Sequence, residues 1–365
     1  MPKRISSLHQ LAQIYADGER CAQLVGLSYS SLETPGFGRQ KAGKGFTFID
    51  TNGQTITNKK VKQRLKELVI PPAWEQVWIC PDEKAHILVT GLDERGRKQY
   101  IYHPKWRVTR DLLKFYRSIM FARQLPKIRK LIQAHISRPG LGYDKVIATM
   151  LWILDNTYIR IGNSVYLAEN ESVGLTTLAD HNIVIAGPVV TFSFKAKSGK
   201  QQQFSIEDKT IARIMQELSS VAGERFFQYC DENGEFHPIE AIDLNEYLKS
   251  IVSVSVTAKD FRTWGGTLLA FNHLIENQNT EEKVDKVIIQ AVDTAATVLG
   301  NTRAVARSSY VHPHILSTYG SKNFDHYYEQ SKATRALAGL DKRESELMYF
   351  LELLFEEEFD LLKTQ

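Results

Sequence analysis

The spacing of apolar residues changes near position 107 of this chain of 365 residues. Before that point, short apolar runs are separated by polar turn signals such as Asn52-Gly53, which is typical of antiparallel strands. From residue 108 to about residue 168, apolar residues recur at the spacing of a helix that buries one face. The pattern predicts an α+β fold, with a small β-rich N-terminal domain over 1–107 and a mostly helical domain over 108–365.

Local signals place individual elements within these domains. We expect a helix within residues 1–30, a Gly-rich loop over 35–46, two short strands about an Asn-Gly turn over 46–57, and a short helix over Lys59–Leu68. Residues 183–206 return to strand spacing with Ser198-Gly199 as the turn, and helices resume from Asp208 almost to the end. The helical domain should therefore contain one small sheet.

Charge is distributed unevenly along the chain. Residues 56–130 contain 18 Lys or Arg against 7 Asp or Glu, whereas residues 341–365 contain 3 against 8. A basic segment can bind polyanions, because each neutralised phosphate releases counterions. A solvated basic face explains the same counts, so charge alone makes nucleic acid a candidate partner without deciding for it.

Other classes of protein are disfavoured by composition. No apolar run approaches the roughly 18 residues that would span a bilayer, and the N-terminus has charges but no apolar core of a secretory signal. The three cysteines, Cys21, Cys80 and Cys230, lie far apart and form no CxxC pair, which favours a reducing compartment. We expect a protein of the cytoplasm, associated with the nucleoid if it binds DNA, with no membrane contact.

The segment GNTRAVARSSYVHP, residues 300–313, places Tyr310 after two arginines. A tyrosine hydroxyl with a pKa of about 10 is a weak nucleophile at neutral pH. Attack on a phosphodiester also needs fixed cationic donors, preferably arginines, and a proton donor for the leaving oxygen. The chain has no HExxH, DxD or paired-Cys motif, so we expect no metal and chemistry performed by side chains.

Three other segments contain side chains that could activate a tyrosine. Arg160 follows an apolar helix, Lys259 and Arg262 lie one helical turn apart, and Lys197 is expected at the end of a strand beside a hairpin turn. Each also has an ordinary structural explanation, because arginine stems commonly cover apolar surface and hairpin lysines are commonly solvated. Taken alone, a tyrosine such as Tyr310 is more often an aromatic at the edge of the core than a nucleophile, and spacing cannot show that the segments converge.

Taken together and in order, these motifs are similar to those of type IB DNA topoisomerases of the small poxvirus-like and bacterial kind. The matching elements are VIPPAWEQVWI (69–79), GLDERGRKQYIYHPKWR (91–107), RIGN-x-x-Y (160–166), FKAKSGK (194–200), KDFRTWGGT (259–267) and LGNTRAVARSSYVHP (299–313). The resemblance extends from about residue 35 to residue 330. It implies the catalytic fold that tyrosine recombinases and these topoisomerases share.

The resemblance implies a role for each matching catalytic residue. Tyr310 matches the nucleophile that forms a transient 3′-phosphotyrosyl bond, and Arg160 and Arg262 match the two arginines that clamp the scissile phosphate. Lys197 matches the general acid that protonates the departing 5′ oxygen, although Lys195 and Lys200 flank it.

Two further positions complete the matching catalytic set. Asn301 stands nine residues before Tyr310, where poxvirus enzymes carry a histidine that bonds a phosphate oxygen. Asparagine departs from that pattern but can still donate a hydrogen bond. Lys259, one turn before Arg262, matches a supporting phosphate contact.

The resemblance also implies DNA contacts outside the catalytic set. Gln99, Tyr100 and Tyr102 match residues that the N-terminal domain places in the major groove, and we count Arg97, Lys98 and Tyr166 among the DNA-binding residues. Alternation along a strand would put Tyr100 and Tyr102 on one face, where they could instead be paired core tyrosines. The Gly-rich segment PGFGRQKAGKGF lacks the GK[ST] ending of a phosphate-binding loop, so we expect no nucleotide cofactor.

The implied activity is relaxation of supercoiled duplex DNA without ATP or metal, by a monomer that closes around the duplex. Two alternatives stay open. A tyrosine site-specific recombinase would share the tyrosine chemistry, but its usual HxxR and LGH are KDFR and LGN in this chain. A catalytically inactive DNA-binding relative would need only the basic N-terminal domain.

Overall fold

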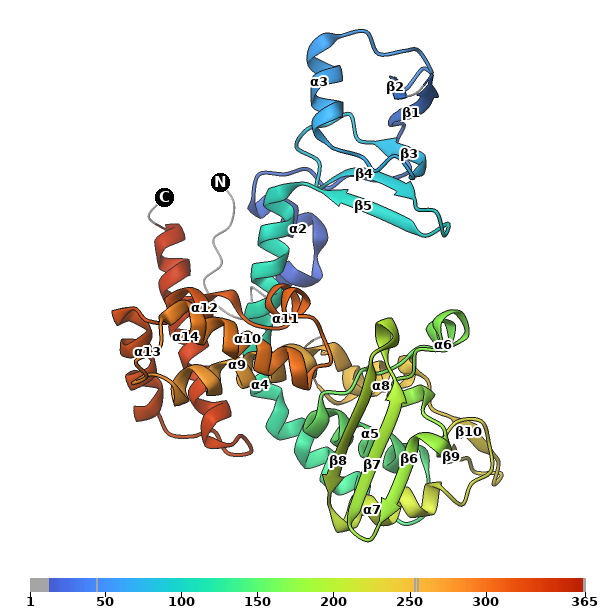
Figure 1. Ribbon diagram of the computed structural model, residues 1–365, viewed down its shortest axis with the longest axis vertical. Coiled ribbons are helices and arrows are strands. Elements are labelled where there is room, and N and C mark those ends of the chain that lie inside the picture. The colour runs from blue at the N-terminus through green and yellow to red at the C-terminus, as the bar shows by residue number, and fades with distance from the viewer. Residues whose placement is uncertain (1–12, 44, 253, 255, 364–365) are drawn as a thin grey trace. The chain divides into compact units, whose positions relative to one another are not determined.

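The computed structural model of the protein describes the chain except residues 1–12, 44, 253, 255 and 364–365 (Figure 1). The chain divides into two compact units, residues 1–114 and 115–365. The boundary expected at residue 107 falls inside helix α4 (Pro104–Ile136), so the first turns of this helix belong to the N-terminal unit. The helix expected within residues 1–30 partly lies outside the described residues, and the described part contains α2 (Gly18–Leu24).

The N-terminal unit is built on a five-stranded antiparallel sheet with the strand order β2-β1-β3-β4-β5 (Figure 1). The strands are β1 (Phe37–Ala42), β2 (Gly45–Ile49), β3 (Glu75–Ile79), β4 (Ile87–Leu92) and β5 (Lys98–Tyr102). Leu65 of helix α3 (Lys59–Glu67) is buried in one cluster with Phe48, Ile79 and Val89 of the sheet. Each such side chain contributes about 1.5–3 kcal/mol by burial, so this cluster is the core of the unit.

Helix α3 confirms the helix predicted over Lys59–Leu68, and its ends have local causes. The Asn58 side chain caps the first turn by accepting the N–H groups of Lys60 and Val61 at 2.9 and 3.2 Å. A cap of this kind stabilises a helix by about 1 kcal/mol. The pair Pro71-Pro72 follows shortly after the last turn and cannot continue a helix.

The prediction of a Gly-rich loop over 35–46 is wrong, because part of this segment forms strand β1 and pairs with β2. Gly38 lies opposite Ile49, and a Cβ on it would come within 2.8 Å of that side chain. The glycine therefore allows a neighbouring strand to pack closely. The predicted second strand after the Asn-Gly turn is reduced to a single bridge between Ile49 and Thr55.

The C-terminal unit is mostly helical. Its helices, beginning with the part of α4 from residue 115, are α5 (Tyr143–Thr157), α6 (Ser164–Asn170), α7 (Lys209–Leu218), α8 (Ala241–Ile251), α9 (Ala258–Glu276), α10 (Val284–Val298), α11 (Arg303–Ser309), α12 (Pro313–Thr318), α13 (Lys322–Ala333) and α14 (Lys342–Lys363). The predicted sheet is confirmed as β6 (Ile183–Ala186), β7 (Val189–Lys195) and β8 (Gln201–Glu207), in that order. No helix in the described part of the chain is both long enough and apolar enough to cross a bilayer.

The apolar spacing predicted uninterrupted helices from Asp208 almost to the end of the chain. The structure differs from this prediction. A two-stranded sheet of β9 (Gln228–Cys230) and β10 (Phe236–Pro238) intervenes. Asn233-Gly234 lies in the turn between them, and Gly234 has a φ of 84°. An Asn-Gly pair between short apolar segments is itself a hairpin signal, and the helical interpretation overlooked it.

Helix α9 is the central helix of the C-terminal unit, since it is buried over most of its length and contacts α8, α10 and α14. A helix buried on all sides is usually apolar throughout. This one carries Arg262, Thr263 and Thr267 among its buried residues. Buried polar groups need partners, and the partners of Arg262 and Thr267 define the candidate site.

Candidate active site

The carboxyl end of α10 turns sharply and presents its last carbonyl groups to other segments. Gly300 adopts the left-handed conformation with a φ of 60°. Its N–H donates to the Thr297 carbonyl at 3.1 Å, and the Asn301 N–H donates to the Ala296 carbonyl at 2.9 Å. These two bonds form a Schellman turn, which glycine at this position favours. The pair Leu-Gly before Asn301 is thus a local stop signal for the helix.

Three basic side chains bind the carbonyls exposed by this turn. The last carbonyls of a helix lack partners within it and carry the negative end of its dipole. Arg262 Nη2 donates to the Leu299 carbonyl at 2.9 Å, and Arg160 Nη2 donates to the Gly300 carbonyl at 3.3 Å. Lys200 Nζ donates to the Asn301 carbonyl at 3.0 Å. One helix end therefore gathers cations from three segments far apart in the sequence.

Arg160 lies on an extended segment after α5 that a second extended segment holds in place. The N–H of Leu175 donates to the Arg160 carbonyl at 2.8 Å. Gly174 permits this approach, because a Cβ there would lie 2.7 Å from the same carbonyl oxygen. The Arg160 guanidinium also donates to Oδ1 of Asn301. Two of the predicted site residues are therefore in direct contact.

Arg262 is 5% exposed and is held from both sides. Besides Leu299, its guanidinium donates to the carbonyl of Tyr158, the residue that ends α5. Tyr158 has a φ of 54°, a left-handed conformation that costs a non-glycine residue on the order of 1 kcal/mol. Its ring packs on Gly265, where any Cβ would overlap the ring. This conformation directs the Tyr158 carbonyl to Arg262.

Tyr310 follows α11 and is half-buried beside Arg262, whose guanidinium carbon lies 4.9 Å from the centre of the tyrosine ring. The Tyr310 carbonyl accepts a hydrogen bond from Thr267 Oγ1 at 3.0 Å. A Cβ on Gly266 would come within 3.0 Å of the Tyr310 Cβ. The Gly-Thr pair of α9 therefore sets the position of the tyrosine backbone.

The electrostatic surroundings lower the pKa of the Tyr310 hydroxyl overall. Burial acts to raise it, but the charge of Arg262 and its hydrogen bond, together with the charges of Arg160 and Lys259, outweigh burial. Burial also lowers the pKa values of the two guanidinium groups, yet arginine stays protonated at neutral pH. The site thus stabilises the phenolate, the nucleophilic form of tyrosine, more than water does.

Three nitrogen donors of this group are buried and have no hydrogen-bond partner within the part of the chain that the structure describes. They are Arg160 Nη1, Arg262 Nε and Asn301 Nδ2. An unsatisfied buried donor costs about 1–3 kcal/mol, so it is uncommon unless it serves a function. Three donors on neighbouring residues suit an anion with several oxygens, such as a phosphodiester.

The β7–β8 hairpin presents its three lysines in different settings. Lys195 forms an ion pair with Glu171 at 2.7 Å, and Lys200 binds the Asn301 carbonyl at 3.0 Å. Lys197 is exposed in the 3-10 turn Lys197–Gly199, outside the buried group. Lys200 therefore anchors the β7–β8 hairpin, which carries Lys197, to the end of α10.

Two other predicted residues lie in the same unit. Lys259 is exposed in the first turn of α9, and its charge contributes to the lowered pKa of Tyr310. Tyr166 belongs to α6, but its side chain is outside the described residues.

The predicted DNA contacts of the N-terminal unit lie on β5 and the turn before it. Tyr100 and Tyr102 stack with ring centres 5.7 Å apart and are 40% and 41% exposed, so they are not core tyrosines. Lys98 shares this exposed face, whereas Gln99 lies on the opposite face and donates to Asp93 at 2.9 Å. Arg97, in the turn, pairs with the same carboxylate at 2.8 Å. On β5, Gln99 therefore does not share the face that carries Tyr100 and Tyr102.

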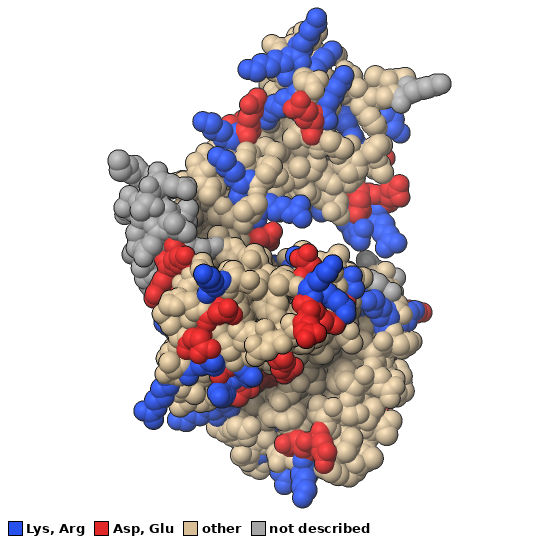
Figure 2. All heavy atoms as spheres, turned by 60° about the vertical axis from the view of Figure 1, so that its left-hand side comes forward, with Lys and Arg blue, Asp and Glu red and all other residues tan. Residues whose placement is uncertain are grey.

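Basic side chains are spread over the N-terminal unit, as the sequence counts predicted. Figure 2 shows Lys and Arg gathered over this unit, with fewer acidic groups among them. Helix α3 alone, KKVKQRLKE, carries five basic residues and one acidic residue.

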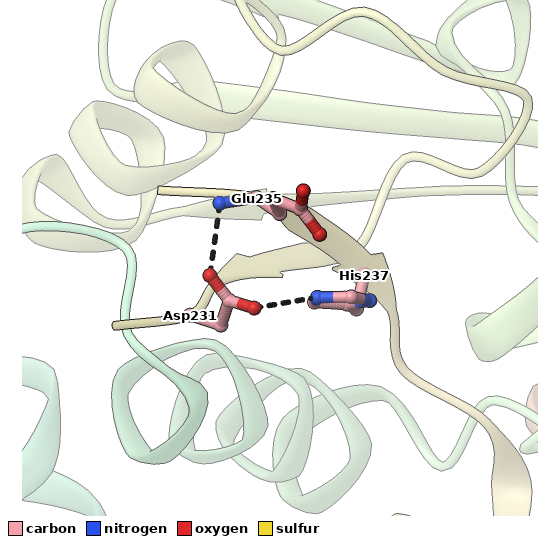
Figure 3. A group of neighbouring side chains, drawn as sticks. All are labelled: Asp231, Glu235 and His237. Carbon is pink, nitrogen blue, oxygen red and sulfur yellow. Dashed lines mark hydrogen bonds and ion pairs between the residues drawn. The ribbon is translucent and has the colours of Figure 1, made fainter. Parts of the chain in front are cut away.

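The β9–β10 hairpin brings together three potential metal ligands that no sequence motif indicated. The ligand atoms of Asp231, Glu235 and His237 are within 4.8 Å of one another. Figure 3 shows that the Asp231 carboxylate accepts the backbone N–H of residue 235 and contacts His237, both at 2.9 Å. These bonds close the hairpin, so they account for the cluster without a metal.

Sequence reasoning did not predict that Thr267 would hold Tyr310 or that Tyr158 would hold Arg262. Thr267 could have been found as a polar residue on the apolar face of a buried helix. Nothing local distinguishes Tyr158, because its left-handed conformation depends on Gly265 and Arg262 from another helix.

Comparison with known proteins gives the same assignment. Residues 103–337 match the family model of the eukaryotic DNA topoisomerase I catalytic core, and residues 45–93 match that of the bacterial DNA topoisomerase IB N-terminal domain. DNA topoisomerase 1B of Acanthamoeba polyphaga mimivirus is 31% identical over 294 residues, covering 78% of this chain and 87% of the relative. DNA topoisomerase I of Monkeypox virus is 22% identical over 274 residues, covering 74% and 83%.

The chain belongs to the type IB DNA topoisomerase family. It is therefore an enzyme that acts on DNA by strand cleavage and religation, and its fold agrees with the α+β prediction. Of the alternatives that the sequence left open, membership in this family favours the topoisomerase over the recombinase.

Replacing Thr267 with valine should slow DNA cleavage by this topoisomerase. Valine lacks the hydroxyl that binds the Tyr310 carbonyl and that accepts the His312 N–H at 3.1 Å. We expect the single-turnover cleavage rate to fall by roughly tenfold, because small displacements of a nucleophile are costly. Thr267→Ser keeps the hydroxyl and is the control. Equal cleavage by the valine variant and the wild type would show that this contact does not position Tyr310.

Proposed function

We propose that the protein relaxes supercoiled duplex DNA by cutting one strand through a 3′-phosphotyrosyl bond to Tyr310, letting the strand swivel, and resealing it. The observation that carries the proposal is the geometry at Tyr310, whose half-buried ring lies 4.9 Å from the guanidinium carbon of the buried Arg262. The charges of Arg262, Arg160 and Lys259 lower the pKa of its hydroxyl. Where burial acts beside an acidic group, the pKa moves the other way: burial and the charge of Asp325 raise the pKa of Tyr319.

In the cleavage step, the hydroxyl of Tyr310 first loses its proton to solvent, and the phenolate oxygen then attacks the scissile phosphorus while the bond to the 5′ oxygen breaks. The departing oxygen takes a proton from Lys197. The free donors of Arg160, Arg262 and Asn301 bind the non-bridging oxygens, whose negative charge grows in the transition state. Religation is the reverse: the 5′-hydroxyl attacks the phosphotyrosine, returns its proton to the lysine and releases Tyr310.

Neither ATP nor a metal is required by this scheme. The phosphotyrosyl ester keeps the energy of the broken bond, so resealing needs no external source. Two guanidinium groups and the Lys197 ammonium supply the cationic donors that a metal ion provides in other phosphoryl-transfer enzymes.

DNA binding in this proposal involves both units of a monomer that closes around the duplex. Tyr100, Tyr102 and Lys98 are the exposed side chains of β5 that would meet a groove, and Arg97 lies next to them. Lys259 would contact the phosphate backbone near the cleaved bond, and Tyr166 stays among the predicted DNA-binding residues. Such an enzyme would work on the nucleoid in the cytoplasm.

Incubating the purified protein with negatively supercoiled plasmid in EDTA and without ATP should produce relaxed topoisomers. With a linear duplex labelled at one strand end in place of the plasmid, denaturing the reaction should leave protein covalently attached to the fragment that carries a 5′ label, because a 3′-phosphotyrosyl bond retains the upstream strand. Relaxation that appears only after Mg²⁺ or ATP is added would contradict the proposed independence. Attachment to the 3′-labelled fragment would contradict the polarity of the bond.

A further inference from the structure

The first turn of the C-terminal helix α14 contains buried acidic side chains that the catalytic scheme does not use. Glu344 is 3% exposed. Helix α14 begins at Lys342, beyond the residues 103–337 that match the catalytic core of the family. A helix that only packed against the domain would bury apolar residues here, so the buried carboxylate needs another explanation.

Glu344 joins three helices through one arginine. Both carboxylate oxygens of Glu344 accept from Arg129 of α4 at 2.7 Å, in a bidentate pair. The same guanidinium donates to both oxygens of Asp155 on α5, at 2.7 and 3.1 Å. Arg129 thus lies between a carboxylate of α14 and a carboxylate of α5, and the planar fork of arginine is what allows it to bind both.

This cluster leads to the groups that hold Arg262. Asp155 lies one helical turn before Tyr158, the residue whose left-handed conformation directs its carbonyl to Arg262. On the other side, Oε1 of Glu344 accepts from Trp264 Nε1 at 3.5 Å, a long hydrogen bond, and Trp264 is two residues after Arg262 on α9. Glu344 is therefore connected both to the acceptor of Arg262 and to the helix that carries Arg262.

Close apolar packing does not replace these ionic contacts. A cavity of about 350 Å³ lies beside them, lined by Arg129, Asp155, Tyr158, Asp341 and Glu344 among others. Beside the end of α5, hydrogen bonds to the carboxylates therefore carry the connection to α14. Weakening them would loosen the end of α5, where only the Tyr158 ring on Gly265 and the bond to Arg262 would still hold this carbonyl near α9.

We propose that Glu344 is a positioning residue for Arg262, acting through Arg129 and Asp155 on Tyr158 and through Trp264 on α9. The C-terminal helix thereby sets how rapidly the enzyme cleaves DNA. This inference rests on the proposed role of Arg262 at the scissile phosphate, but it can fail while that role stands.

The first test compares two charge-removing variants of α14. Glu344→Gln should lower the single-turnover rate of DNA cleavage by at least about tenfold, because a small displacement of a catalytic group is costly. DNA affinity should be unchanged. Glu352→Gln is the matched control, since Glu352 also joins α14 to α4, through Arg123 at 2.8 Å, but this ion pair reaches neither α5 nor α9. If both variants lowered the cleavage rate equally, Glu344 would have only a general role in packing α14, and the inference would be wrong.

A double-mutant cycle separates positioning from folding. If Glu344 acts through Arg262, adding Glu344→Gln to Arg262→Ala should cause no further loss of cleavage, because coupled residues are not additive. A full further loss in that background would overturn the inference. Wild-type cleavage by Arg262→Ala alone would instead remove Arg262 from the proposed mechanism.

A second variant keeps the test decisive if Glu344→Gln fails to fold. Arg129→Lys retains the positive charge but cannot bind Glu344 and Asp155 with two parallel bonds each. Arg129→Lys should also lower the rate of DNA cleavage. Added to Arg262→Ala, it should cause no further loss of that rate. Unchanged cleavage by Arg129→Lys would contradict the inference.

Discussion

Replacing Tyr310 with phenylalanine should abolish both plasmid relaxation and the covalent protein–DNA adduct. Phenylalanine keeps the ring beside Arg262 and removes only the hydroxyl that we propose attacks the phosphorus. We expect the cleavage rate to fall by more than about 1,000-fold, the scale on which covalent enzymes lose activity with their nucleophile. DNA affinity should stay the same, since the arginines and the basic N-terminal unit are intact.

The matched control is Tyr349→Phe. Its hydroxyl donates to the Arg335 carbonyl at 3.2 Å, away from the site, so removal of the same atom there should leave relaxation unchanged. Gel relaxation, adduct formation and filter binding would be measured on all three proteins. Relaxation by Tyr310→Phe at the wild-type rate would return Tyr310 to the status of an ordinary half-buried aromatic.

Replacing Arg262 with alanine should reduce the rate of DNA cleavage by at least about 100-fold, as losing one preorganised donor to a developing oxyanion does in other enzymes. Two effects combine here. The Arg262 Nε donor is lost from the proposed phosphate site, and the charge that most lowers the pKa of Tyr310 disappears. Lysine should not rescue the rate fully, because an ammonium cannot reproduce the planar fork that binds Leu299 and Tyr158.

The second effect predicts a shift in pH dependence. Cleavage by the phenolate rises with pH up to the pKa of Tyr310. Without the Arg262 charge that pKa is higher, so the rise of the variant's cleavage rate should lie at higher pH than that of the wild type. Arg213→Ala, which removes a largely exposed arginine from α7, should change neither the rate nor the profile. A loss under about threefold, less than 1 kcal/mol, would remove Arg262 from the site.

The elements that sequence predicted well are those whose cause is local. Helix α3 is defined by an N-cap at Asn58 and by prolines after its last turn, and both signals lie within a few residues of the helix. In the β7–β8 hairpin, Val190, Phe192 and Phe194 alternate with polar residues before the turn at Gly199, and the stop after α10 follows from Gly300. The order of the catalytic motifs identified the family, which the comparisons confirm.

The errors arose where local signals depend on distant partners. Gly38 is a loop residue by composition, but it lies in a strand because Ile49 fills the space that a side chain would occupy. The neighbour that decides is on another strand of the sheet. Gln99 adjoins Tyr100 in sequence, and strand geometry places it on the opposite face, bound to Asp93. Its contact with DNA stays a prediction.

By itself, the sequence determined the α+β class, the order of the motifs and the residue types that phosphodiester chemistry needs. Only the tertiary structure decided that Arg160, Arg262 and Lys200 meet at the carbonyl end of α10, and that Arg129 joins α4, α5 and α14 behind them. The physical reason is that helices and turns follow from interactions between near neighbours in the chain. The assembly of buried charges depends on which distant groups are available to satisfy them.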